Sequence, residues 1–122
     1  MPTISVVDDD LSVRKALSRL IAVAGYTAAA YDSAEAFIEA AAAETSDCVI
    51  LDVHLPGKTG LELQAELVAS RARCPVVFIT AFDDESARSL ALQAGAVEFL
   101  RKPLDTERLL DVIKSALESH SG

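Results

Sequence analysis

The chain has 122 residues, of which 51% are apolar and 25% charged, a composition typical of one globular domain and unlike that of a disordered segment. Its formal net charge of -8 at pH 7 argues against direct binding to nucleic acid or to an anionic membrane. The N-terminal residues do not resemble a signal peptide, and no stretch reaches the roughly 18 apolar residues of a membrane span, so we expect a cytoplasmic protein.

The chain opens with a short apolar run and then a helical pattern. Residues 4–7 indicate a buried strand that stops at Asp8. Residues 13–24 place apolar side chains at helical spacing on one face, and Gly25 follows as a typical helix stop. Residues 27–31 are a weak strand candidate, because their three alanines are poor strand formers.

A second helix and a second clear strand follow. Ser33 can cap this helix, and residues 48–52 form an apolar run typical of a buried strand. The apolar face predicted for the helix consists of Ala34, Phe37, Ile38 and Ala41.

The second half repeats the alternation. Thr59 and Glu62 fit a capping box, so we expect a helix from about Gly60 to Ser70. Residues 75–80 are the most strand-like segment of the chain, and Asp83 begins another helical pattern. The expected buried face of that helix consists of Ala87, Leu90, Ala91 and Ala94.

The last predicted strand is residues 97–100, and Asp105 can cap a final helix. Five strand–helix units with helices long enough for crossovers predict a parallel sheet covered on both faces. The two cysteines, Cys48 and Cys74, have no companion metal-ligand pattern, so we expect buried reduced thiols.

Gly57-Lys58-Thr59 looks like the end of a nucleotide-binding loop. That loop, G-x-x-x-x-G-K-[ST], would need glycine at the position held by Asp52, whose carboxylate would face the phosphates. Pro56 also removes one of the backbone donors that would hold them. We therefore interpret the tripeptide as a turn in which Thr59 caps the next helix.

Polar residues follow most of the predicted strands. Parallel strands end at one edge of the sheet, where such folds bind ligands, so these residues should meet there. Three acids, Asp8, Asp9 and Asp52, suit a cation such as Mg²⁺, while Thr80 and Lys102 supply a donor and a positive charge for an anion. A single acid at a strand end is commonly a helix cap or a solvated loop residue, and we assign Asp10 to one of these two roles.

These residues lie within motifs that resemble a known family. The motifs are "VVDDD", "LDVHLPGKTGLEL", "VVFITA" and "AGAVEFLRKP", and over residues 3–118 the chain resembles the CheY-like receiver domains of two-component response regulators. With "YDSAEAFIEA" it is most similar to FixJ-like receivers, which usually precede a LuxR-type helix-turn-helix domain. The resemblance implies an α/β fold with three layers, in which a doubly wound, five-stranded parallel sheet has the strand order 2-1-3-4-5.

The resemblance also implies roles for individual residues. Asp52 would be the phosphoacceptor for a sensor histidine kinase, and Asp8, Asp9, Asp52 and the backbone carbonyl of His54 would hold Mg²⁺, for which Mn²⁺ can substitute. Thr80 and Lys102 would bind the phosphoryl group. Thr80 and Phe99 would act as the switch, and a cis peptide is expected before Pro103.

The implied protein is a phosphoacceptor that catalyses its own phosphorylation and dephosphorylation, without turnover of an independent substrate. Phosphorylation would alter the face formed by the helix after Asp83, the strand 97–100 and the final helix, through which a homodimer could form. Residues 1–120 would be the receiver, and 121–122 a tail that begins a linker to a DNA-binding output domain outside this sequence. A stand-alone receiver is the alternative.

Two side chains near the expected site are open to more than one interpretation. His54 is either a loop side chain that flanks the site or a group that makes phosphoryl lifetime sensitive to pH. Phe82 either shields the phosphoryl group from water or is a plain surface aromatic.

Three other functions compete with a phosphorylated receiver. A dehalogenase-type phosphohydrolase also uses an aspartate nucleophile, but needs a second aspartate where this chain has His54. A flavodoxin-type carrier needs a hydroxyl-rich loop where this chain has Asp8, Asp9 and Asp10. A receiver that acts as an adapter without phosphorylation is the third.

Overall fold

The computed structural model describes residues 1–120, and the expected tail, residues 121–122, lies outside the described residues. Five strands form one sheet with the order β2-β1-β3-β4-β5, and every neighbouring pair is parallel. The expected fold class and strand order are therefore confirmed. The strands are β1 (Thr3–Val7), β2 (Thr27–Tyr31), β3 (Cys48–Asp52), β4 (Val76–Thr80) and β5 (Glu98–Arg101).

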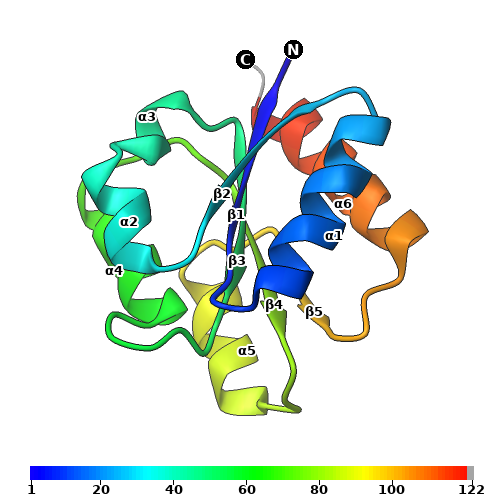
Figure 1. Cartoon of the computed structure of the whole chain (residues 1–122). Coiled ribbons are helices and arrows are strands. Elements are labelled where there is room, and N and C mark those ends of the chain that lie inside the picture. Colours follow the sequence, from blue (N-terminus) through cyan, green and yellow to red (C-terminus); the bar gives the residue numbers. More distant parts are fainter. Residues whose placement is uncertain (121–122) are drawn as a thin grey trace.

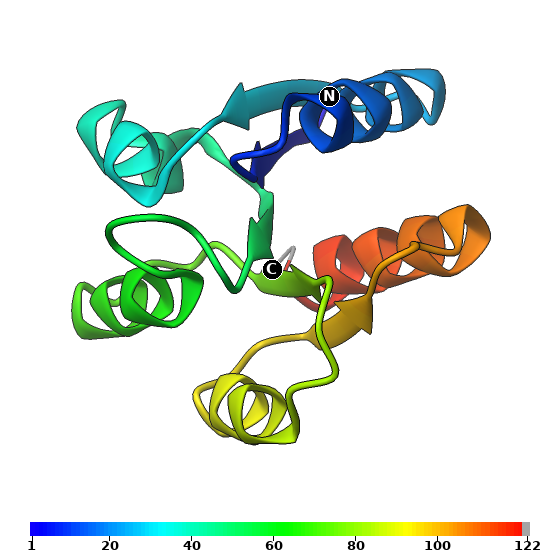
Figure 2. The ribbon, with the colours of Figure 1, turned by 60° about the horizontal axis from the view of Figure 1, so that its bottom comes forward.

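Helices cover both faces of the sheet (Figures 1 and 2). One face carries α1 (Leu11–Val23) and α6 (Thr106–His120). The other carries α2 (Ala34–Glu39), α3 (Ala42–Thr45), α4 (Gly60–Ala69) and α5 (Glu85–Gln93). Within residues 1–120, no helix has both the length and the apolar character that a membrane span needs.

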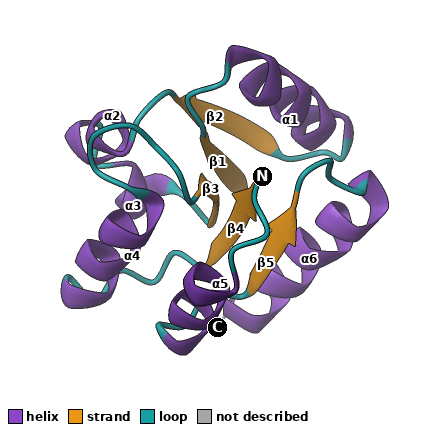
Figure 3. Ribbon diagram, turned by 90° about the horizontal axis from the view of Figure 1, so that it is seen from below, coloured by secondary structure: helices purple, strands orange, loops and turns teal. Residues whose placement is uncertain are grey.

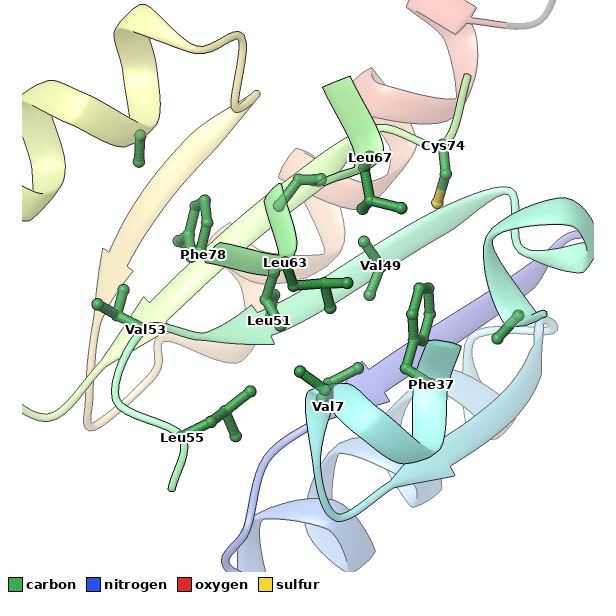
Figure 4. Packing of buried hydrophobic residues seen from close by; sticks show 14 of the residues in the cluster. Val7, Phe37, Val49, Leu51, Val53, Leu55, Leu63, Leu67, Cys74 and Phe78 are labelled. Atoms are coloured by element: carbon green, nitrogen blue, oxygen red, sulfur yellow. The ribbon is translucent and has the colours of Figure 1, made fainter. Parts of the chain in front are cut away.

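Each face of the sheet has its own apolar core. All five residues of β3 are buried; Val49 and Leu51 belong to the cluster under α2, α4 and α5, whereas Ile50 belongs to the cluster under α1 and α6. Figure 4 shows the first cluster, with Phe37 and Leu63 packed over β3. A strand buried on both faces has no polar side to present, which explains the uninterrupted apolar run in the sequence.

The expected caps are present at the helix N-termini. The Asp10 side chain accepts a hydrogen bond from Ser12 N at 2.8 Å, and Ser33 accepts one from Ala36 N at 3.0 Å. Thr59 and Glu62 form the reciprocal capping box of α4. Gly57 has φ +74°, a turn conformation that glycine adopts without strain. The Gly-Lys-Thr tripeptide is thus a turn and a cap.

The predicted apolar faces are partly wrong in two helices, although Ala34, Phe37, Ala87 and Ala91 are buried as expected. Helix α2 ends at Glu39, and Ala41 has φ 52°, outside the helix, where the chain turns into the one-turn helix α3. Ile38 is 44% exposed and Leu90 is 58% exposed. Helix α5 packs on the sheet through the small residues Ala87 and Ala91, which bring it close to the strands and leave Leu90 on its outer side.

The two cysteines are free and buried, as expected. Cys48 belongs to the cluster under α1 and α6, and Cys74 to the cluster on the other face. Burial raises the pKa of both thiols to about 12. Both side chains therefore act as apolar core groups at neutral pH.

Candidate functional site

The candidate site lies at the C-terminal ends of the parallel strands. Figure 3 shows the sheet from below, roughly along its strands. Asp8 follows β1, Asp52 ends β3, Thr80 ends β4, and Lys102 follows β5. Asp52 lies opposite Ile79, and Thr80 lies opposite Arg101. The parallel register therefore brings to one edge residues that are far apart in sequence.

Three carboxylates and one ammonium group form the centre of the site. Oxygen atoms of Asp8, Asp9 and Asp52 all lie within 4.8 Å of one another. Lys102 Nζ donates to Asp8 Oδ2 at 2.8 Å and lies 3.7 Å from Asp52 Oδ2. Asp8 and Asp52 are buried whereas Asp9 is exposed, so the cluster is open to solvent on the side of Asp9.

Asp8 is held from several directions. Its Oδ1 accepts a hydrogen bond from Asp10 N at 2.9 Å, and its Oδ2 faces Lys102. Arg14 Nη1 donates to the Asp8 main-chain carbonyl at 2.8 Å. The sequence did not single out Arg14, because the helical pattern of residues 13–24 by itself does not show that its side chain reaches back to β1.

The environment of Asp52 opposes its ionisation. Burial raises the pKa of this carboxyl, and the nearby negative charges of Asp8 and Asp9 raise it further. A hydrogen bond from His54 N to Asp52 Oδ1 at 3.1 Å and the charge of Lys102 lower it, without reversing the direction. The ionised carboxylate is therefore less favourable in the folded chain than in water.

Lys102 stays positively charged although it is partly buried. Burial by itself would lower its pKa, but the hydrogen bond to Asp8 and the charges of Asp52, Asp8 and Asp10 raise the pKa overall. The ammonium group is thus a fixed cation among the acids. The peptide between Lys102 and Pro103 is cis, as the resemblance implies.

The two residues expected to form the switch lie on adjacent strands. Thr80 is fully buried, and its Oγ1 accepts a hydrogen bond from Phe82 N at 3.1 Å. Phe99 packs against the core cluster under α5, with its ring 6.0 Å from that of Phe78. Thr80 therefore lies at the C-terminal end of β4, whereas Phe99, on β5, packs against the neighbouring core cluster.

His54 and Phe82 contact each other beside the acids. Their ring centroids are 4.9 Å apart, with the planes at 89°, an edge-to-face geometry that contributes about 0.5–1.5 kcal/mol in other proteins. His54 Nε2 also lies 3.8 Å from Asp84 Oδ2. Phe82 is 59% exposed, so it is a surface aromatic that packs on the site's histidine.

Gly60 is a site residue that the sequence revealed only as a helix start. A β-carbon at this position would lie 2.2 Å from the main-chain oxygen of Asp52 and 3.0 Å from Val53 Cα. Gly60 N donates to Val53 O at 3.0 Å. The first turn of α4 thus packs directly on the backbone of Asp52, and only glycine fits there.

The donor set fits a hard divalent cation. Mg²⁺ prefers carboxylate oxygens and typically keeps several waters, and the exposed carboxylate of Asp9 leaves room for them. Lys102 offsets part of the remaining charge on Asp8 and Asp52. The carboxylates of Asp8, Asp9 and Asp52 could therefore hold Mg²⁺, while the ligand role of the His54 carbonyl stays a prediction.

Comparison with known proteins supports the resemblance. The family model of the response regulator receiver domain matches residues 4–114. Nodulation protein W of Bradyrhizobium diazoefficiens is 37% identical over 93% of this chain and 50% of its own length. Transcriptional regulatory protein FixJ of the same organism is 36% identical over 93% of this chain and 56% of its length.

A solved structure, that of response regulator StyR, superposes with a TM-score of 0.92 and 42% identity over 98% of this chain and 61% of that chain. The chain spans about half the length of these two curated relatives, 50% and 56%.

The contact between Gly60 and Asp52 generates a first prediction. Gly60→Ala should lower the free energy of unfolding by about 1–3 kcal/mol, because the new β-carbon forces the Asp52 backbone to move. Gly25→Ala is the control, since Gly25 has φ +94° but nothing within 4 Å of an added β-carbon, and it should cost about 1–2 kcal/mol. Calorimetric Mg²⁺ titration should show weaker binding for Gly60→Ala alone; equal Mg²⁺ affinity in both variants would contradict the prediction.

The raised pKa of Asp52 generates a second prediction. Ionised Asp52 destabilises the fold above its folded-state pKa, and the penalty disappears as pH falls through the usual carboxyl range. Without Mg²⁺, Asp52→Asn should therefore raise the melting temperature at pH 7 by a few degrees, and the difference should shrink as the pH approaches 4. Asp111→Asn, on the exposed side of α6, should change little at either pH.

Proposed function

The chain belongs to the response regulator receiver domain family, and we propose that it accepts a phosphoryl group from a sensor histidine kinase on Asp52. The observation that carries this proposal is the cluster in which Asp8, Asp9 and Asp52 surround one another with Lys102 in contact. Three acids for a divalent cation and one lysine for an anion match what phosphoryl transfer to a carboxylate requires.

In the proposed reaction a carboxylate oxygen of Asp52 attacks the phosphorus of a phosphohistidine. The phosphorus–nitrogen bond breaks, the imidazole leaves with the electron pair, and Asp52 becomes an acyl phosphate. Lys102 Nζ, 3.7 Å from Asp52 Oδ2, pairs with the charge on the phosphoryl oxygens. Mg²⁺ held by Asp8, Asp9, Asp52 and the His54 carbonyl would offset more of that charge.

Thr80 is the group that we propose responds to the phosphoryl group. Its hydroxyl accepts from Phe82 N in the unmodified chain and would turn to donate to a phosphoryl oxygen. That movement would vacate space beside Phe99, whose ring packs toward the core. The face formed by α5, β5 and α6 would change as a result, and a homodimer could form through it.

The names of the relatives support a proposal about what the full-length protein controls. FixJ is named as a transcriptional regulatory protein, and this chain spans about half of it. We propose that the full-length protein carries a DNA-binding output domain and acts in the cytoplasm, with regulation of transcription as the result. The receiver itself would turn over no independent substrate.

Phosphoryl uptake provides a direct test of the proposal. Incubation with Mg²⁺ and acetyl phosphate should add the mass of one phosphoryl group, and Asp52→Asn should abolish the addition, because no carboxylate oxygen is then available as nucleophile. Mass spectrometry measures both. Sustained hydrolysis of a phosphate ester would favour a phosphohydrolase, flavin binding would favour a carrier, and a wild type that stays unmodified would favour an adapter.

A substitution of Lys102 should impair both phosphoryl uptake and the response to it. Lys102→Met removes the cation near Asp52 while keeping most of the side-chain volume, so phosphoryl uptake should slow and phosphorylation-dependent dimerisation should be lost. Lys15→Met, on the exposed side of α1, is the control and should behave as the wild type. Size-exclusion chromatography before and after acetyl phosphate measures the effect; normal dimerisation of Lys102→Met would remove Lys102 from the response.

A further inference from the structure

Three residues connect the loop after β3 to the N-terminus of α5. His54 Nε2 lies 3.8 Å from Asp84 Oδ2, and the His54 ring packs edge to face on Phe82 with centroids 4.9 Å apart. We call His54, Phe82 and Asp84 the His54 clasp. The clasp joins two segments that follow neighbouring strands of the sheet, β3 and β4.

Each clasp residue has a second contact, and two of these lead to residues of the proposed site, Asp52 and Thr80. His54 N donates to Asp52 Oδ1 at 3.1 Å, and Phe82 N donates to Thr80 Oγ1 at 3.1 Å. Both residues are therefore bonded to side chains that would face a phosphoryl group. A change in the side chain of Asp52 or Thr80 would therefore alter a hydrogen bond from the main chain of a clasp residue.

The third contact leads to α5. Asp84 is the N-cap of this helix, and its Oδ1 accepts a hydrogen bond from Ala87 N at 3.0 Å. Its other oxygen, Oδ2, faces His54. The same carboxylate thus caps α5 and contacts the phosphoacceptor loop, so the position of His54 affects how α5 begins.

We propose that His54 and Asp84 are positioning residues that tie the N-terminus of α5 to the phosphoacceptor loop, so that α5 senses the state of Asp52. The sensing rests on the proposed function. Phosphoryl oxygens on Asp52 would accept hydrogen bonds from nearby groups, among them the Thr80 hydroxyl, which now contacts the clasp residue Phe82. Once the Thr80 hydroxyl turns toward them it no longer accepts from Phe82 N, and the His54 loop must adjust to the modified side chain.

This route differs from the one through Thr80 and Phe99, although Thr80 takes part in both. Phe99 belongs to β5, whereas the clasp runs from the loop after β3 to the start of α5. The helix would therefore receive the signal at its N-terminus as well as through the strand beside it.

The chain offers a matched pair of variants for testing the clasp. Asp84→Ser keeps a good helix N-cap, since serine and aspartate cap about equally well, but its side chain is too short to reach His54. Asp83→Ser is the same substitution one position earlier. The Asp83 side chain is 81% exposed and lies 3.7 Å from Arg101 instead, so this control changes charge equally without touching the clasp.

Hydrogen–deuterium exchange of residues 85–93 in the unmodified protein tests the contact itself. Asp84→Ser should speed exchange about two- to five-fold, the range expected for losing a partly exposed polar contact. His54→Ala removes this contact and the ring contact with Phe82, so it should speed exchange at least as much. The double variant should exchange no faster than His54→Ala, because that variant already lacks the contact with Asp84. An Asp84→Ser variant that exchanges like Asp83→Ser would overturn the proposal.

Exchange after treatment with Mg²⁺ and acetyl phosphate tests the sensing. Wild type and Asp83→Ser should show a change in exchange at residues 85–93 on phosphorylation, and Asp84→Ser should show much less, although mass spectrometry still detects the phosphoryl group. A full response in phosphorylated Asp84→Ser would overturn the sensing role. A wild type that takes up no phosphoryl group would instead overturn the proposed function, and the unmodified comparison would still decide whether the clasp holds α5.

Discussion

Negative charge is concentrated at the C-terminal ends of the strands, and the fold must place a cation there to offset it. Asp8 and Asp52 are buried and their oxygens lie within 4.8 Å of each other and of Asp9. Burial and, to a smaller extent, the neighbouring negative charges disfavour the ionised form of Asp52 and raise its pKa. Lys102 offsets part of the repulsion between the carboxylates, because its ammonium group lies close to both buried acids.

That arrangement requires the first and last strands of the chain to end close together. Lys102 is 94 positions from Asp8, and the doubly wound sheet brings them together because β1 and β5 end at the same edge as β3. Gly60 contributes at closer range, since a side chain there would push the Asp52 backbone out of place. The parallel sheet thus holds Asp52 in a strand and places Asp8, Asp9 and Lys102 directly after strand ends, where the strands position them.

The same edge also explains how a change at Asp52 could reach a distant surface. His54 N donates to Asp52 Oδ1, and the His54 ring lies beside Asp84 at the start of α5. Thr80 is linked to the same segment, because its Oγ1 accepts a hydrogen bond from Phe82 N. Helix α5 packs closely on the sheet through small residues, Ala87 and Ala91, and Gln64 Nε2 donates to Ala91 O at 2.9 Å. Its N-terminus meets the phosphoacceptor loop through Asp84 and His54, a partly exposed contact that can be lost or gained locally.

From the sequence alone, the alternation of strands and helices, the caps of α2, α4 and α6 and the polar residues at the strand ends could be predicted, because periodicity and capping are local properties. The sequence also identified Asp8, Asp9, Asp52, Thr80 and Lys102 as one group, since parallel strands end together. Only the tertiary structure decided which side of α5 is buried, why Gly60 must be glycine, and that Arg14 and Asp84 reach Asp8 and His54. These depend on the distance between packed elements, which no local pattern encodes.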